Sequence, residues 1–166
     1  GTGTRYFADS GYAALDLGPG HRALLDLAPV GPDYQPGHAH ADTLSFELSL
    51  FGRRLLVNSG TSRYGVDRER LRQRATAAHN TVEVDGQDSS EVWSGFRVAR
   101  RARPTVTRFE NEGGRIHVSA GHDGYRRLAG DNVHYRDWQA RPGELLIQDR
   151  VSGAHGQAVA RFHLHP

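Results

Sequence analysis

The chain contains no cysteine, no methionine and no lysine among its 166 residues. Without cysteine it can form no disulfide, and a thiolate metal site is excluded. Any metal site must therefore use histidine, carboxylate, amide or water ligands, and ten histidines make such a site feasible. All 21 basic residues are arginines, which we attribute to a biased genome composition rather than to function.

Long apolar runs and a strong net charge are also absent. No apolar run approaches the roughly 18 residues of a membrane span, so we expect none. The net charge is only +2, and the basic residues are not interleaved with aromatic ones as on a nucleic-acid platform, so we expect no nucleic-acid partner. One arginine cluster, Arg97, Arg100, Arg101 and Arg103, suits a surface that meets an anionic polymer, although a solvated strand face explains it equally well.

Short alternating apolar segments recur between turn signals rich in glycine, which is typical of antiparallel strands. We expect strands near residues 12–17, 22–27, 43–50, 53–57, 80–84, 97–103, 105–109, 116–120, 133–140, 145–151 and 157–164. Residues 67–78 are weakly helical and charged, and we expect an ordered loop with a turn of helix there rather than a core element. We predict one all-β domain over residues 1–166, a large antiparallel β-sandwich of about ten or more strands.

Three polar groups stand at the ends of these strands. His38 and His40 lie two residues apart just before a strand, so an extended backbone points them to the same face. Asn58 follows one strand and His79 precedes another. Two imidazoles and one oxygen donor form a plausible zinc set with a position left open for water. Alternatively, the side chains of His40, Asn58 and His79 only hydrogen-bond to one another and tie the sheet together.

Three segments resemble, in order and spacing, the signature of the heparinase II/III-like polysaccharide lyases. They are Gly-His-Ala-His-Ala-Asp at 37–42, Leu-Leu-Val-Asn-Ser-Gly-Thr at 55–61 with Tyr64, and Ala-His-Asn-Thr-Val-Glu-Val-Asp-Gly at 78–86. The resemblance covers about residues 10–110. It implies a C-terminal β-sandwich that packs against an α/α toroid and cleaves uronate-containing acidic polysaccharides by β-elimination.

The resemblance also assigns roles to individual residues. His38 resembles the histidine that faces the substrate, and Tyr64 resembles an aromatic residue lining the cleft beside the site. His40 and His79 resemble the first and last zinc ligands. The middle ligand of the family is an aspartate, and Asn58 stands in its place, although a neutral amide is the weaker ligand. Asp42 could substitute for it, or brace the loop instead.

Further expectations concern the rest of the chain. Trp93 could stack on sugar rings with Arg97 beside it, or could cover a sheet edge. His163 and His165 are expected on the outer face of the last strand, without partners. The chain starts without methionine and stops directly after a strand, so we expect a fragment, inactive alone, of a periplasmic or secreted enzyme whose N-terminal toroid is missing. The alternative is a non-catalytic carbohydrate-binding or structural module.

Overall fold

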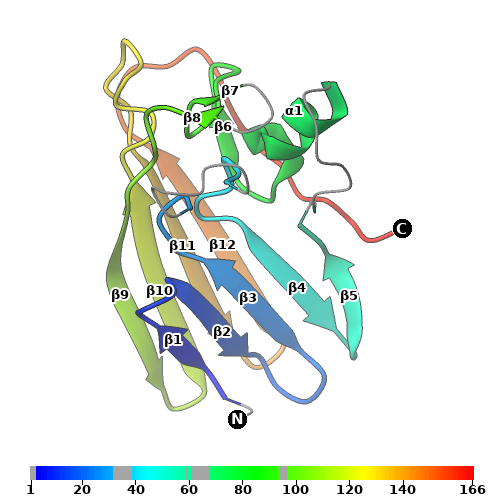
Figure 1. Cartoon of the computed structure of the whole chain (residues 1–166). Coiled ribbons are helices and arrows are strands. Elements are labelled where there is room, and N and C mark those ends of the chain that lie inside the picture. The colour runs from blue at the N-terminus through cyan, green and yellow to red at the C-terminus, as the bar shows by residue number, and fades with distance from the viewer. Residues whose placement is uncertain (1–2, 32–38, 59, 61–67, 94–96) are drawn as a thin grey trace.

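The computed structural model describes residues 3–31, 39–58, 60, 68–93 and 97–166. Two antiparallel sheets face each other, one of five strands in the order β1-β2-β3-β4-β5 and one of four in the order β12-β11-β10-β9 (Figure 1). Two short sheets pair β13 with β6 and β7 with β8. The predicted all-β antiparallel sandwich is confirmed.

The strand bounds follow the alternating segments of the sequence. The five-stranded sheet contains β1 (Arg5–Phe7), β2 (Tyr12–Asp16), β3 (Arg22–Asp26), β4 (Phe46–Leu50) and β5 (Arg53–Leu56). The four-stranded sheet contains β9 (Pro104–Glu112), β10 (Arg115–His122), β11 (His134–Arg141) and β12 (Glu144–Val151). The short strands are β6 (Val82–Val84), β7 (Val92–Trp93), β8 (Arg97–Val98) and β13 (Ala158–Ala160).

The main core lies between the two large sheets, where every second side chain of each strand points inward. Leu15 and Leu25 enter it from the five-stranded sheet, and Val118 and Trp138 enter it from the other. All four side chains are fully buried. Burial of this apolar surface is the main stabilising contribution to the sandwich.

The expected hairpin at Phe51 and Gly52 is present between β4 and β5. Both turn residues have positive φ, 54° and 71°. A two-residue turn of this kind matches the right-handed twist of the flanking strands, which fixes the register of β5 on β4.

The helical segment differs from its expectation. It forms α1 (Arg68–Arg74) and a 3₁₀ turn, η2 (Thr76–Ala78), at the same end of the sandwich as β6, β7 and β8 (Figure 1). Arg70 and Arg74 are fully buried whereas Leu71 and Arg72 are exposed, so the segment is a short helix with one buried face and not only a loop with a turn of helix. The Arg74 guanidinium donates to the carbonyls of Ala39 (2.9 Å) and Arg97 (3.2 Å), and these acceptors lie far away in the sequence. No helix in the described part of the chain is long and apolar enough to cross a membrane.

Two other expectations were only partly right. Of residues 97–103, only Arg97–Val98 pairs as a strand, because Ala102 donates its N–H to Ser90 Oγ (2.8 Å) instead of to a neighbouring strand. His163 has partners, contrary to expectation. Its N–H donates to Asn80 Oδ1 (2.6 Å), and its Nε2 lies 3.1 Å from the carbonyl oxygen of Ala77.

A buried polar network connects the sheets at the end where α1 lies. The fully buried Arg136 of β11 donates to both carboxylate oxygens of Asp149, from Nε at 2.7 Å and from Nη2 at 2.9 Å. Its Nη1 donates to the carbonyls of Leu44 (2.9 Å) and Asn80 (2.6 Å). His134 Nε2 also bonds to Asp149 (2.7 Å). One side chain thus joins the four-stranded sheet to the segments that precede β4 and β6.

We expect Arg136→Met to lower the free energy of unfolding by about 3–5 kcal/mol, because the change leaves Asp149 without its cation and two buried carbonyls without their donor. Urea unfolding followed by the fluorescence of the buried Trp138 measures this. Arg150→Met is the matched control, because this arginine lies on the exposed side of β12 over the Tyr135 ring, and its loss should cost less than about 1 kcal/mol. Equal losses in both variants would contradict the role of Arg136.

The buried His122 and His134 should lower the stability as the pH falls through about 6.5, whereas the raised pKa values of Asp26 and Asp42 act in the opposite direction. Burial lowers the pKa of His122 well below its usual value, and burial lowers that of His134 as well, against the opposing bond from Asp149. Below the unfolded-state pKa of about 6.5 the unfolded chain therefore binds protons that the folded chain does not, and each histidine contributes a slope of up to about 1.4 kcal/mol per pH unit. Denaturation from about pH 7.5 to 5.5 measures the slope. His122→Gln should flatten it and the exposed His155→Gln should not; an unchanged slope in His122→Gln would refute the assignment.

Candidate metal and substrate site

The segment before β4 carries His40 and Asp42, and hydrogen bonds from distant residues hold its backbone. The N–H of Ala41 donates to the carbonyl of Arg74 (2.9 Å), and Thr76 Oγ1 donates to the carbonyl of Ala41 (2.9 Å). With the bond from the Arg74 guanidinium to Ala39, the α1–η2 region holds this segment at three points.

The other side of the same segment is held by the residues around β6 and β11. Thr81 Oγ1 donates to the carbonyl of Thr43 (3.0 Å), and Arg136 donates to that of Leu44. Asn80 Nδ2 donates to the carbonyls of Phe46 (2.8 Å) and Val57 (3.1 Å). Each buried carbonyl has a named donor, so the side chains between them start from a fixed backbone.

Three potential ligands meet on this frame. One nitrogen each of His40 and His79 and one carboxylate oxygen of Asp42 all lie within 4.8 Å of one another. The two imidazole rings have centroids 5.2 Å apart. Asn58 Oδ1 lies 2.5 Å from His79 Nδ1, and the Asn58 side chain also hydrogen-bonds to Asp42. The four residues come from three separate parts of the sequence, as the motifs indicated.

The hydrogen bonding at His79 favours a metal-binding tautomer. If Nδ1 carries the proton that Asn58 Oδ1 accepts, Nε2 keeps the lone pair, and Nε2 is buried without a hydrogen-bond partner in the described part of the chain. Burial, followed by the charges of His40 and His163, lowers the pKa of His79 to about 3, although the Gln73 backbone acts in the opposite direction. The ring is therefore neutral at physiological pH, as a ligand must be.

The surroundings of the two carboxyl groups near the site disfavour their ionised forms. Burial raises the pKa of Asp42 well above its usual value, the charge of Asp26 raises it further, and the hydrogen bond from Asn58 opposes both. Burial also raises the pKa of Asp26 to about 6. A divalent cation bound between Asp42 and the imidazoles would remove this penalty, because its charge favours the ionised carboxylate. The donors present, two imidazoles and one carboxylate, fit zinc.

Asp42 belongs to the cluster of potential ligands, and Asn58 hydrogen-bonds to two of its members, His79 and Asp42. The assignment of Asn58 as a direct ligand stays a prediction. A further group, Arg70, was missed from the sequence. Its Nη1 lies 3.3 Å from His40 Nε2, and the residue is fully buried. No signal in the arginine-rich segment 68–74 distinguishes it from the exposed Arg72.

The remaining predicted site residues have different outcomes. His38 and Tyr64 lie outside the described residues. Trp93 is 50% exposed at the end of β7, and the Arg97 guanidinium lies 4.9 Å from its ring centroid. The two predicted substrate-binding residues therefore form one exposed cation–π pair. Arg74 connects this pair to the metal cluster, since its guanidinium bonds to the carbonyls of both Ala39 and Arg97.

Comparisons with known proteins agree with the fold. The family model described as heparinase II/III-like, C-terminal, matches residues 1–166. The comparison with curated proteins found no match. A solved structure of heparinase III superimposes with a TM-score of 0.80 at 22% identity, over 99% of this chain and 25% of that chain. Heparan sulfate lyase HepC from Pedobacter heparinus gives 0.78 at 19% identity, over 98% and 24%.

The chain thus spans about a quarter of the length of the solved proteins that it resembles. The structural likeness on its own shows the shared sandwich fold. The family model extends over every residue of the chain and includes all three motif segments. This chain therefore belongs to the heparinase II/III-like family and corresponds to the C-terminal domain of that family.

Proposed function

We propose that the chain is the sandwich domain of a polysaccharide lyase that cleaves uronate-containing acidic glycans by β-elimination. The observation that carries the proposal is the cluster of His40, Asp42 and His79, held on a fixed backbone two residues from His38. The proposal is further supported by the family, whose solved members are named heparinase III and heparan sulfate lyase. Sulfated and unsulfated uronate glycans are the substrates to test first.

β-Elimination requires a base to take the proton beside the uronate carboxylate and an acid to protonate the leaving glycosidic oxygen. Neutralising that carboxylate stabilises the enolate-like intermediate electrostatically. We assign this last role to His38, with a hydroxyl from Tyr64, and we assign the principal base and acid to a toroid domain in the remainder of the protein. Trp93 and Arg97 offer a stacking surface and a cation for the glycan chain.

Zinc fits the cluster as a resident ion. His40, Asp42 and His79 would hold it, and Asn58 hydrogen-bonds to both His79 and Asp42. When bound, the ion would cross-link the segment before β4 to the segment before β6. This chain's own contribution is to position the neighbouring His38. We infer a periplasmic or secreted location, because polymeric acidic glycans are met outside the cytoplasm.

One observation favours the alternative, a carbohydrate-binding or structural module without turnover. The guanidinium of the buried Arg70 already places a positive charge 3.3 Å from His40 Nε2. An internal cation could balance Asp42 without any metal. The two proposals differ in metal content, which can be measured directly.

We expect the purified protein, after chelation, to bind one zinc ion per chain and to gain about 2.7 kcal/mol of stability at a free zinc concentration of roughly 100 Kd. Asp42→Asn should weaken zinc binding while leaving the metal-free protein at least as stable, because burial disfavours the carboxylate. His40→Ala should lose both zinc and the gain in melting temperature. Asp16→Asn, on β2, is the control. An equal thermal gain from zinc in Asp42→Asn would show that the cluster is not the site.

We expect the full-length protein to produce unsaturated uronate ends from an acidic glycan, and the absorbance of these ends measures the rate. The variant His38→Ala should lower kcat by about 100-fold. The exposed His155→Ala should keep the parent rate. The isolated residues 1–166 should show no turnover, because the principal acid and base lie elsewhere. Turnover by the isolated domain, or an unchanged kcat in His38→Ala, would contradict the proposed role.

A further inference from the structure

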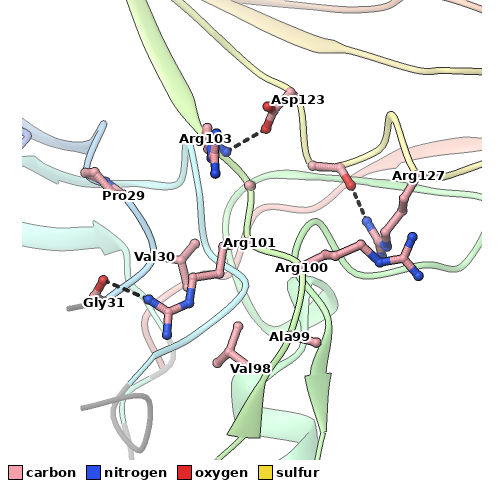
Figure 2. A pocket seen from close by; sticks show the side chains of 12 residues that line it. Pro29, Val30, Gly31, Val98, Ala99, Arg100, Arg101, Arg103, Asp123 and Arg127 are labelled. Carbon is pink, nitrogen blue, oxygen red and sulfur yellow. Dashed lines mark hydrogen bonds between the residues drawn. The ribbon is translucent and has the colours of Figure 1, made fainter. Parts of the chain in front are cut away.

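An open cavity of about 730 Å³ lies beside the site and is lined by arginines from two distant segments (Figure 2). Arg100, Arg101 and Arg103 come from the stretch between β8 and β9, and Arg127 comes from the turns after β10. Asp123 is the one carboxylate among the lining residues. The sequence showed the first three arginines as a cluster, but gave no sign that Arg127 joins them.

Three of the four guanidiniums are held in place by the protein. The side chains of Arg100 and Arg127 both contact Glu91, at 2.9 and 3.9 Å. Arg127 also donates to the carbonyls of Gly124 and Asp88. On the other side of the cavity, Arg101 reaches the carbonyl of Gly31 (3.4 Å), as Figure 2 shows.

The fourth guanidinium, that of Arg103, is exposed and forms no hydrogen bond or ion pair within the described part of the chain. The backbone of Arg103 is fixed, because its N–H donates to Asp123 Oδ1 (2.7 Å) and its carbonyl accepts from the Asp123 N–H (3.4 Å). Four guanidiniums face two carboxylates, Asp123 and Glu91, and this leaves an excess of positive charge. The cavity therefore combines an excess of positive charge with an exposed guanidinium on a fixed backbone, and this arrangement suits an anion.

The position of the cavity relates it to the proposed cleavage site. Its apolar wall includes Val30, Val98 and Ala102, which pack together with Ala39 in a small core. Ala39 lies between His38 and His40 in the sequence. Gly31, which accepts from Arg101, is the last described residue before the segment that contains His38. The cavity wall and the segment that carries His40 therefore share one small core at Ala39.

We propose that this cavity binds an anionic substituent, a sulfate or a carboxylate, of the acidic glycan, and that Arg103 is the side chain that contacts it. The guanidinium offers paired N–H donors that match the oxygens of either group. The inference rests on the proposed function for the identity of the ligand, but its test is binding and does not depend on turnover.

The experiment measures binding to the full-length protein by titration calorimetry, with His38→Ala to slow cleavage of the glycan during the titration. The probes are a sulfated glucosamine–uronate tetrasaccharide, the same tetrasaccharide after chemical desulfation, and inorganic sulfate. Arg103→Gln should weaken binding of the sulfated probe about tenfold, and Asp123→Asn should strengthen it, since the amide oxygen still accepts the Arg103 N–H while the negative charge is lost. Arg53→Gln, an exposed arginine on β5, is the matched control and should change nothing.

Each result decides the inference. A loss confined to the sulfated probe assigns the cavity to a sulfate, and an equal loss for both oligosaccharides assigns it to a carboxylate. Unchanged binding in a folded Arg103→Gln variant overturns the proposal. If the melting temperature of that variant falls while binding is unchanged, the cavity is instead a contact with the rest of the protein, and the proposal is also overturned. Inorganic sulfate binding as tightly as the oligosaccharide also overturns it. If the full-length protein is a lyase but Arg103→Gln leaves binding unchanged, this inference alone is wrong. If Arg103→Gln weakens binding but the full-length protein shows no lyase activity, only the proposed function is wrong.

Discussion

The geometry of the candidate site depends on the hydrogen bonds that the Arg136 guanidinium donates. This side chain leaves the four-stranded sheet, crosses the end of the core and donates to the carbonyls of Leu44 and Asn80. Leu44 lies two residues after Asp42, and Asn80 follows His79 directly, so one side chain sets the spacing of two potential ligands from different segments. Only arginine has enough donors in a fixed plane to serve two carbonyls and both oxygens of Asp149 together.

Charge is balanced differently on the two sides of this arginine. On the far side, Asp149 accepts from both Arg136 and His134, and these bonds keep its pKa below the usual range despite burial, which acts in the opposite direction. On the near side, burial and the charge of Asp26 raise the pKa of Asp42. Either protonation of Asp42 or a nearby cation relieves this cost, and the Arg70 guanidinium lies 3.3 Å from the neighbouring His40 Nε2.

Much of this arrangement could be predicted from the sequence, because it follows from local patterns. Alternating apolar residues predicted the strands of both sheets except β1, and the three motif segments predicted that His40, Asn58 and His79 lie together. The burial of Arg70 and Arg74 could not be predicted, because an arginine-rich helix has the pattern of a solvated surface. Their partners are a ring nitrogen and backbone carbonyls brought near by the fold, and carbonyls carry no sequence signal. The cavity beside the site was hidden for the same reason.

The fixed backbone also explains why strain is tolerated beside the ligands. Leu44 has a φ of 63°, a conformation that costs a non-glycine residue about 1–3 kcal/mol. Its N–H donates to the carbonyl of Asp26 and its carbonyl accepts from Arg136, so both polar groups are satisfied only in this conformation. The turn it makes lies between Asp42 and the start of β4 at Phe46, and in it the Asp42 carbonyl accepts from the Ser45 N–H. A site whose backbone is ordered in advance spends little binding energy on ordering itself, which favours the binding of an ion by His40, Asp42 and His79.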